Sequence, residues 1–191
     1  MKEFLLLFFM CLIGLSIDAQ QEVNFRVQSD GTFLTAEGKR FIELDCPGFT
    51  QEELYYAYLV TVEHKCVTSG VQFATVSNKC INVYSYEKYF ASYSVWSGGF
   101  AGYLYYKFMF QFKDGKVRIE NPIVDHLGNG AKNTLYMKFA EMLHNPNRPL
   151  FNENGTVVEK RAGDVASLNN DLNVTLVDII QAAASVLQWQ H

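Results

Sequence analysis

The feature that most constrains this fold is an Asp-Gly turn between two strands of alternating hydrophobicity, in residues 102–124. Asp114-Gly115 is a dipeptide typical of the two-residue turns that join antiparallel strands. Counting back from this turn pairs Phe112 with Val117, so the apolar side chains of both strands share one face. An antiparallel sheet with one buried face follows. The same count pairs Phe110 with Ile119 and, on the opposite face, Gln111 with Arg118.

A helix that begins near Thr50 is the second well-marked element. Thr50 and Glu53 have the spacing of a capping box, in which each side chain bonds to the backbone N–H of the other residue. Phe49 and Leu54 are placed for the hydrophobic staple that accompanies such a box. The helix should end near residues 65–69. Its apolar stripe has helical spacing and comprises Leu54, Tyr55, Tyr58, Leu59, Val62 and Cys66.

The remaining pattern places one strand before this helix and four after it. Strands are predicted at residues 40–45, 71–75 and 79–86, in addition to the two strands of the hairpin. Residues 87–101 and 125–130 read as loops, and residues 133–144 as a short helix. A final helix is predicted from residue 173 or 175 to residue 189. Its predicted inner stripe comprises Leu176, Ile179, Ile180, Ala183 and Leu187.

The first 19 residues have the order of a secretory signal. Lys2 precedes an apolar run from Phe4 to Leu15, and Ala19 marks the expected cleavage point. An uncleaved anchor is the alternative, and lipidation at Cys11 is disfavoured by the bulky residues before it. We therefore expect an exported protein that is periplasmic, outer-membrane-associated or extracellular, with no transmembrane span after cleavage. The net charge of -4 argues against a nucleic-acid partner.

Three cysteines follow the signal: Cys46, Cys66 and Cys80. An odd number permits at most one internal disulfide. Their spacing matches no zinc signature, and we interpret them mainly as small buried apolar residues. A Cys66–Cys80 bridge is the open alternative.

One helix on one face of an antiparallel sheet defines an α+β fold. Residues 40–124 resemble an exported domain of unknown function with a TBP-like fold, which is known mainly from Gram-negative gut and oral anaerobes. No catalytic residue comes with that resemblance, and TBP-like topology does not imply DNA binding. Three motifs support it: Phe41-Ile42-Glu43-Leu44 before Pro47-Gly48, the helix start Thr50-Gln51-Glu52-Glu53-Leu54-Tyr55, and the hairpin of residues 105–112 and 116–120.

The expected organisation has four parts. Residues 1–19 form the signal, and residues 20–38 an N-terminal arm or hairpin. The TBP-like domain covers residues 39–124. A mostly helical C-terminal extension, residues 125–191, packs on that domain.

Aromatic residues on the outer face of the predicted sheet, together with Trp96 nearby in sequence, are the candidate binding residues. Clustered exposed aromatics form contact surfaces for glycans, peptides or proteins. The alternative is that the C-terminal extension covers this face and buries it as a second core. The binding candidates are Tyr84, Tyr86, Tyr103, Tyr105 and Trp96.

The sequence offers little catalytic chemistry. Asp125 and His126, together with Asp45 or Glu43, are the residues from which a hydrolase-like or metal-binding site could be built. His64 and Cys66 cannot form a direct pair, because residues two apart on a helix point in different directions. We assign no catalytic residue, metal ligand or cofactor.

The sequence therefore predicts an exported, non-enzymatic binding or assembly module of the cell envelope. Its expected partner is another envelope protein, a peptide or a glycan. The alternatives are an enzyme that uses the Asp125/His126 loop and a purely structural, self-associating domain. An open aromatic face would favour the first reading, and an acidic strand residue beside Asp125 and His126 would favour the enzyme.

Overall fold

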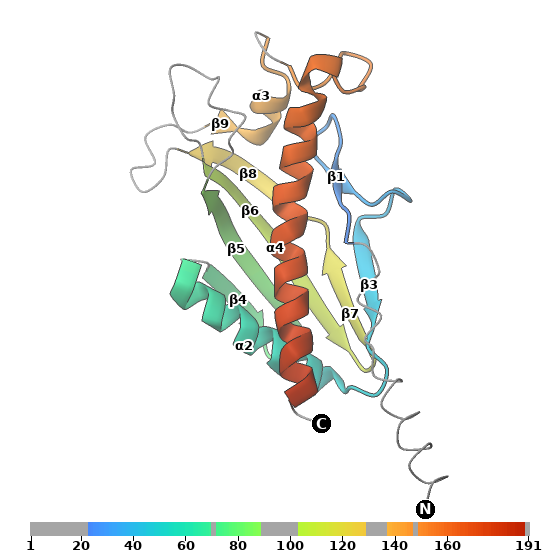
Figure 1. Cartoon of the computed structure of the whole chain (residues 1–191), viewed down its shortest axis with the longest axis vertical. Helices are drawn as coiled ribbons and strands as arrows, with labels where there is room; N and C mark the ends of the chain where they lie inside the picture. Colours follow the sequence, from blue (N-terminus) through green and yellow to red (C-terminus); the bar gives the residue numbers. More distant parts are fainter. Residues whose placement is uncertain (1–22, 70–71, 89–102, 129–136, 147–148, 190–191) are drawn as a thin grey trace, which may run out of the picture.

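The computed structural model describes residues 23–69, 72–88, 103–128, 137–146 and 149–189, and all structural statements below concern these residues (Figure 1). A short hairpin precedes a strand, a long helix and six further strands, of which the pattern predicts the first four. The strands are β1 (Arg26–Val27), β2 (Phe33–Leu34), β3 (Phe41–Asp45), β4 (Gln72–Val76), β5 (Cys80–Lys88), β6 (Tyr103–Lys113), β7 (Lys116–Glu120), β8 (Ile123–Gly128) and β9 (Met137–Lys138). The helices are α2 (Gln51–Ser69), α3 (Phe139–Leu143), the 3-10 turn η2 (Glu159–Arg161) and α4 (Ala162–Trp189).

Strand β6 is the centre of the main antiparallel sheet, whose path runs β3-β7-β6-β5-β4. Along one side, residues 103–111 of β6 pair with the whole length of β5. Along the other side it pairs first with β8 and then, nearer the turn, with β7. Asn121 and Pro122 separate β7 from β8, and Pro122 cannot donate to a ladder. The two strands therefore share one side of β6 in succession.

The predicted hairpin is confirmed in its register. Phe112 lies opposite Val117, Phe110 opposite Ile119 and Gln111 opposite Arg118. Gly115 takes a φ of 71°, which glycine adopts at no steric cost. The turn also contacts the helix, because Asp114 Oδ1 accepts a hydrogen bond of 2.8 Å from the Gln51 backbone N–H. This contact fixes the start of α2 at the end of the sheet.

The capping box of α2 is also confirmed. The Thr50 backbone N–H donates to Glu53 Oε2 at 2.8 Å, and the Glu53 N–H donates to Thr50 Oγ1 at 3.3 Å. Phe49 and Leu54 are both buried, as the staple requires. Local sequence therefore specifies where this helix begins.

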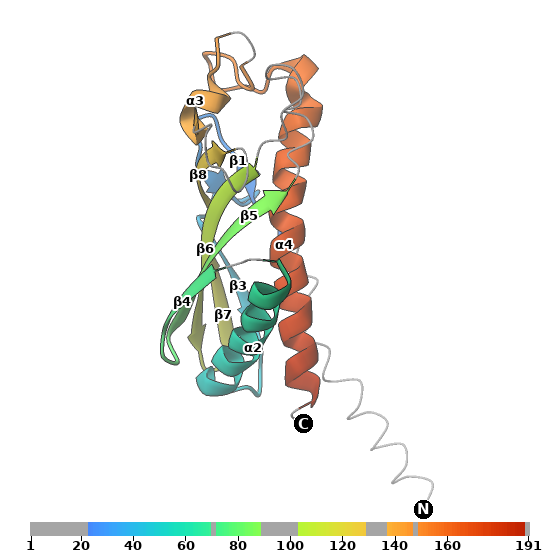
Figure 2. The same ribbon diagram turned by 90° about the vertical axis from the view of Figure 1, so that its left-hand side faces the viewer.

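Helices α2 and α4 lie on the same face of the sheet, as the edge-on view in Figure 2 shows. The core fills the space between them and the apolar side of β6. Tyr58 of α2 lies 4.9 Å from Phe110 and 5.4 Å from Phe112, measured between ring centroids. On α4, Thr175 Oγ1 lies 3.3 Å from the Tyr106 hydroxyl. One face of the sheet is thus covered by the two helices α2 and α4.

Two asparagines of α4 bind the backbone of the N-terminal arm. Asn173 accepts from the Phe25 N–H at 2.9 Å and donates to the Phe25 carbonyl at 2.9 Å. One turn earlier, Asn169 Oδ1 accepts from the Val27 N–H at 2.8 Å. Four helical residues rise about 6 Å, close to the rise of two strand residues, so the two amides match alternate residues of the arm. The helix thereby supplies part of the pairing that a neighbouring strand would give.

The C-terminal part differs from the prediction in three places. Residues 125–128 are not a loop, because the free part of β6 offers backbone partners and draws them into β8. The final helix begins at Ala162, about three turns or more before the start at residue 173 or 175 that local capping signals suggested, although its predicted inner stripe is buried. Residues 133–136 lie outside the described residues, and α3 occupies only Phe139–Leu143 of the predicted short helix.

Cys46 and Cys80 are free thiols, so the Cys66–Cys80 bridge is absent, and the Cys66 side chain lies outside the described residues.

Among the described residues, one helical stretch, Glu159–Trp189, is long and apolar enough to cross a membrane. Its apolar stripe packs against the core described above, as expected for the core helix of a globular domain.

Candidate functional site

The candidate site lies on the face of the sheet opposite the helices, which we call the open face. Strand alternation directs Tyr105, Lys107, Met109 and Gln111 of β6 to this face, and all four are half-buried or exposed. The expectation that the C-terminal extension covers the aromatic face is wrong for α4, the main helix of that extension. The apolar stripe of α4 packs with α2 on the other face, because that face carries the larger apolar surface.

A bulge in β8 brings an acid and a histidine together on the open face. Tyr106 pairs with Val124 and Tyr105 pairs with His126, so Asp125 is the extra residue between them. Without the bulge, alternation would direct His126 into the core. With it, His126 Nδ1 lies 2.8 Å from Asp125 Oδ2, and the imidazole stacks on Tyr105.

The stacked pair forms one wall of a groove of about 520 Å³. The Tyr105 and His126 rings are 4.4 Å apart between centroids and are inclined by 12°. Tyr84 is 46% exposed, and Ile123 is 52% exposed, so the groove presents apolar surface to solvent. The residues that line it are Gln72, Tyr84, Ser85, Tyr105, Tyr106, Lys107, Ile123, Asp125 and His126.

Two of the predicted binding residues lie together in the structure, and the side chains of the other three lie outside the described residues. Tyr84 and Tyr105 line the same groove. Tyr86 is the backbone partner of Tyr105, and Tyr103 that of Gly128, but their side chains lie outside the described residues. Trp96 also lies outside the described residues. The structure therefore brings together two of the five candidates.

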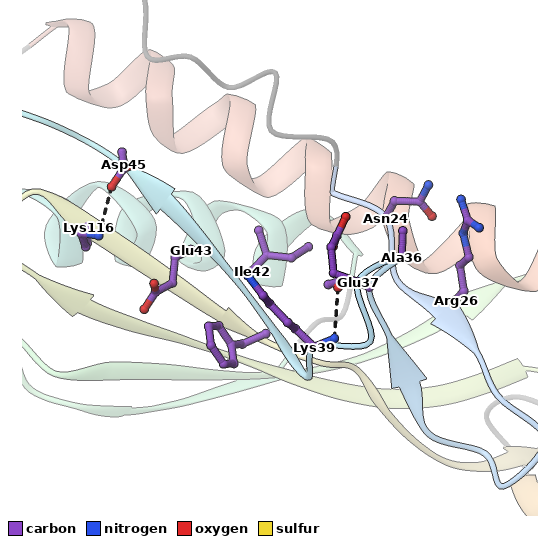
Figure 3. A pocket seen from close by; sticks show the side chains of 11 residues that line it. Asn24, Arg26, Ala36, Glu37, Lys39, Ile42, Glu43, Asp45 and Lys116 are labelled. Atoms are coloured by element: carbon purple, nitrogen blue, oxygen red, sulfur yellow. Dashed lines mark hydrogen bonds and ion pairs between the residues drawn. The ribbon is translucent and has the colours of Figure 1, made fainter.

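The residues of the enzyme alternative are not brought together. Asp125 and His126 line the aromatic groove, whereas Glu43 and Asp45 line a separate charged pocket beside β3 (Figure 3). Asp45 there forms an ion pair with Lys116 at 3.3 Å. No group of three or more metal-ligating side chains occurs within the described ranges. The condition set above for an enzyme, an acidic strand residue beside Asp125 and His126, is therefore not met.

Sequence reasoning missed that His126 belongs to the aromatic cluster. The Gly-rich run after it suggested a loop, and a loop residue has no predictable face. The available signal was the alternation of Val124 and Leu127 around one extra residue, which is the pattern of a bulged strand. Read in that way, the sequence would have placed His126 on the face of a strand opposite Val124 and Leu127, although not beside a particular partner strand.

Comparison with known proteins supports the fold and goes no further. A structure of a DUF4468 family protein from Bacteroides ovatus is similar, with a TM-score of 0.59 and 14% identity over 87% of this chain and 94% of that chain. A TBP-like protein from Parabacteroides distasonis matches with a TM-score of 0.48 and 13% identity over 75% of this chain and 90% of that chain. No family model and no curated protein matches. The α+β fold and the resemblance to domains of unknown function are confirmed; at this identity the likeness shows the fold alone.

Proposed function

We propose that this protein is an exported, non-enzymatic binding module of the cell envelope that recognises its partner through the groove on the open face. The observation that supports this most directly is the aromatic cluster of Tyr84, Tyr105 and His126 in one solvent-accessible groove. Aromatic rings bury a large area at little conformational cost, and their polar ends still bond to water or ligand. Such clusters are typical of recognition surfaces.

The proposal also explains the bulge in β8. Inserting Asp125 interrupts a ladder, yet it turns His126 outward and gives the imidazole a carboxylate partner. Bulges that redirect a side chain occur next to binding and active sites. Ser85 also lines the groove, but its pairing with the buried Tyr106 places it on the covered face. Asp125 and His126 therefore act in our proposal as binding groups that fix the orientation of the Tyr105 ring.

Export is part of the same proposal and rests on the N-terminal sequence. A short basic start, an apolar run and Ala19 are the features that support it. Cell fractionation followed by intact-mass measurement tests this part. We expect an envelope-associated chain that begins near Gln20. A chain that retains Met1 and stays with the cytosolic fraction would refute the export claim.

The binding claim is tested by titrating the purified chain with neutral and acidic oligosaccharides and with peptides, followed by calorimetry. We expect Tyr84→Ala and Tyr105→Ala each to weaken the binding seen with the intact chain. Tyr56→Ala is the matched control, because Tyr56 is 53% exposed but belongs to α2 on the covered side. Equal losses in all three variants, or binding unaffected by the two groove variants, would refute the role of the groove.

A further inference from the structure

The open face continues beyond the aromatic groove into a basic region, and we propose that its ligand is an acidic polysaccharide. This inference rests on the proposed binding function and specifies the chemistry of the ligand. Five cationic residues support it, and they extend from the groove to the far end of the sheet: Lys107, Lys113, Lys116, Arg118 and Lys79.

Strand register places these cations in successive rows across the open face. Lys107 lies between Tyr84 on β5 and Ile123 on β8, at the aromatic groove. Further along β6, Gln111 lies between Cys80 and Arg118. The residues of this second region line a hollow of about 340 Å³ that also contains Lys79, Lys113 and Lys116, with Glu43 as its one acidic residue. One continuous face therefore carries aromatic rings at one end and cations at the other.

Two of these lysines oppose each other directly. Lys113 and Lys116 are register partners beside the turn, so their side chains leave the sheet on the same face. Like charges placed directly opposite destabilise a sheet. Asp45 neutralises only Lys116, at 3.3 Å, and within the described residues Lys79, Lys107 and Lys113 form no ion pair. An anionic ligand would relieve this repulsion.

The carboxylates of the open face are concentrated towards its edges. Asp45 pairs with Lys116, Glu120 with Arg118 at 3.2 Å, and Asp125 with His126. Glu43 lies opposite Arg118. The central strand β6 contains two lysines and no acidic residue. A chain whose overall charge is -4 thus keeps four cations at the turn end of this face and one, Lys107, at the aromatic groove.

The guanidinium group of Arg118 is held in one orientation by its neighbours. Its guanidinium carbon lies 3.6 Å from the centroid of the Phe41 ring, and its Nε forms an ion pair with Glu120 of the same strand at 3.2 Å. Such stacking removes conformational freedom, so less is lost when the group binds a ligand. The basic region therefore contains one pre-oriented cation beside the lysines.

The dimensions favour a polymer over a small anion. Tyr105 and Lys113 are eight residues apart on β6, a distance of about 27 Å at the usual rise of a strand. A sugar acid polymer offers a ring face for aromatic stacking and an anionic group on the same unit. An acidic peptide that bound by strand addition would need a sheet edge. The groups described here project from the face, which favours the polysaccharide.

The test titrates the full mature chain with a galacturonate hexamer, a neutral cellohexaose and a glutamate hexapeptide at low and physiological salt. We expect the galacturonate hexamer to bind best, and its affinity to fall as the Debye length shortens from about 30 Å at 0.01 M to about 8 Å at 0.15 M salt. Lys79→Glu combined with Lys113→Glu should weaken its binding about tenfold or more at low salt, since two contacts become repulsive. Lys160→Glu, an exposed single reversal on η2, is the control for charge reversal outside the two hollows and should leave binding nearly unchanged.

The outcomes separate this inference from the function on which it rests. Binding that is lost in Tyr84→Ala but unchanged in the double lysine variant would overturn the acidic ligand and preserve the groove. Stronger binding of the glutamate hexapeptide would overturn the polysaccharide and indicate an acidic protein partner. No binding of any of the three probes would overturn this inference, whereas the groove would still be tested by the wider titration above. Urea unfolding of each variant confirms that it is folded.

Discussion

The two faces of β6 show how one strand serves two purposes. Leu104, Tyr106, Phe108, Phe110 and Phe112 are all buried under α2 and α4. Their neighbours Tyr105, Lys107, Met109 and Gln111 stay half-buried or exposed. The covered face holds the fold together by burial of apolar area, at roughly 1.5–3 kcal/mol for each large side chain. The open face adds less to stability, and its side chains are therefore available for recognition.

This difference implies that stability and binding should respond to different substitutions on the same strand. A truncation on the covered face leaves a cavity, whereas a truncation on the open face is filled by water.

Phe110→Ala should lower the free energy of unfolding by about 3–5 kcal/mol, because Phe110 is fully buried and packs on Tyr58. Urea unfolding followed by circular dichroism measures this change. Met109→Ala, one residue away on the open face, is the control and should cost clearly less. Similar losses at both positions would contradict the division between the two faces.

Alkaline pH should lower the free energy of unfolding through the buried thiol of Cys46. Burial, with a smaller contribution from the charge of Asp45, raises the pKa of the Cys46 thiol from 9.0 to about 11. The unfolded chain then loses its thiol proton at lower pH than the folded chain does. Stability from this group is complete below pH 9 and is lost as pH rises towards 11, by up to about 2–3 kcal/mol.

Urea unfolding at pH 8, 9 and 10 measures this loss. Cys46→Ala should reduce the decline with pH, whereas Cys80→Ala should retain it, since Cys80 is less buried. Burial also raises the pKa of the Tyr58 phenol strongly, so Tyr58 adds a similar decline at still higher pH. A pH dependence that is identical in both cysteine variants would refute this account.

Asn173→Ala should lower the free energy of unfolding by about 1–2 kcal/mol, because it leaves both backbone groups of Phe25 without their amide partner. Backbone hydrogen exchange at residues 25–27 should also become faster in this variant. Asn170→Ala, exposed on the same helix, is the matched control. Unchanged exchange in the arm would show that α4 does not hold it.

Tyr84→Ala should change the free energy of unfolding by no more than about 0.5 kcal/mol, because nearly half of its surface already faces solvent. Ligand binding should nevertheless be weakened in the titrations described above. A large loss of stability would place Tyr84 in the core and contradict its assignment to the open face.

Local signals in the sequence predicted the parts of the fold that depend on neighbouring residues. The Asp114-Gly115 turn fixed the register of β6 and β7, and the Thr50–Glu53 box fixed the start of α2. Alternation along β6 then identified the two faces and placed Tyr105 opposite the core. These features were predictable because each depends on contacts within a few residues or across a two-residue turn.

The candidate site was only half predictable. Tyr84 and Tyr105 were identified from alternation alone, whereas His126 was assigned to a loop. The bulge at Asp125 and the pairing of β8 with β6 depend on which part of β6 is left free by β7. That choice involves residues about twenty positions apart, which no local pattern encodes.

By itself, the sequence determined the hairpin, the helix start and the separation of β6 into an apolar and a mixed face, because turn geometry and side-chain period act locally. Only the tertiary structure decided that α4 joins α2 on one face and leaves the other open to solvent among the described residues. The physical reason is that an apolar helix packs where the largest apolar area becomes buried, and this area exists only once the sheet has formed.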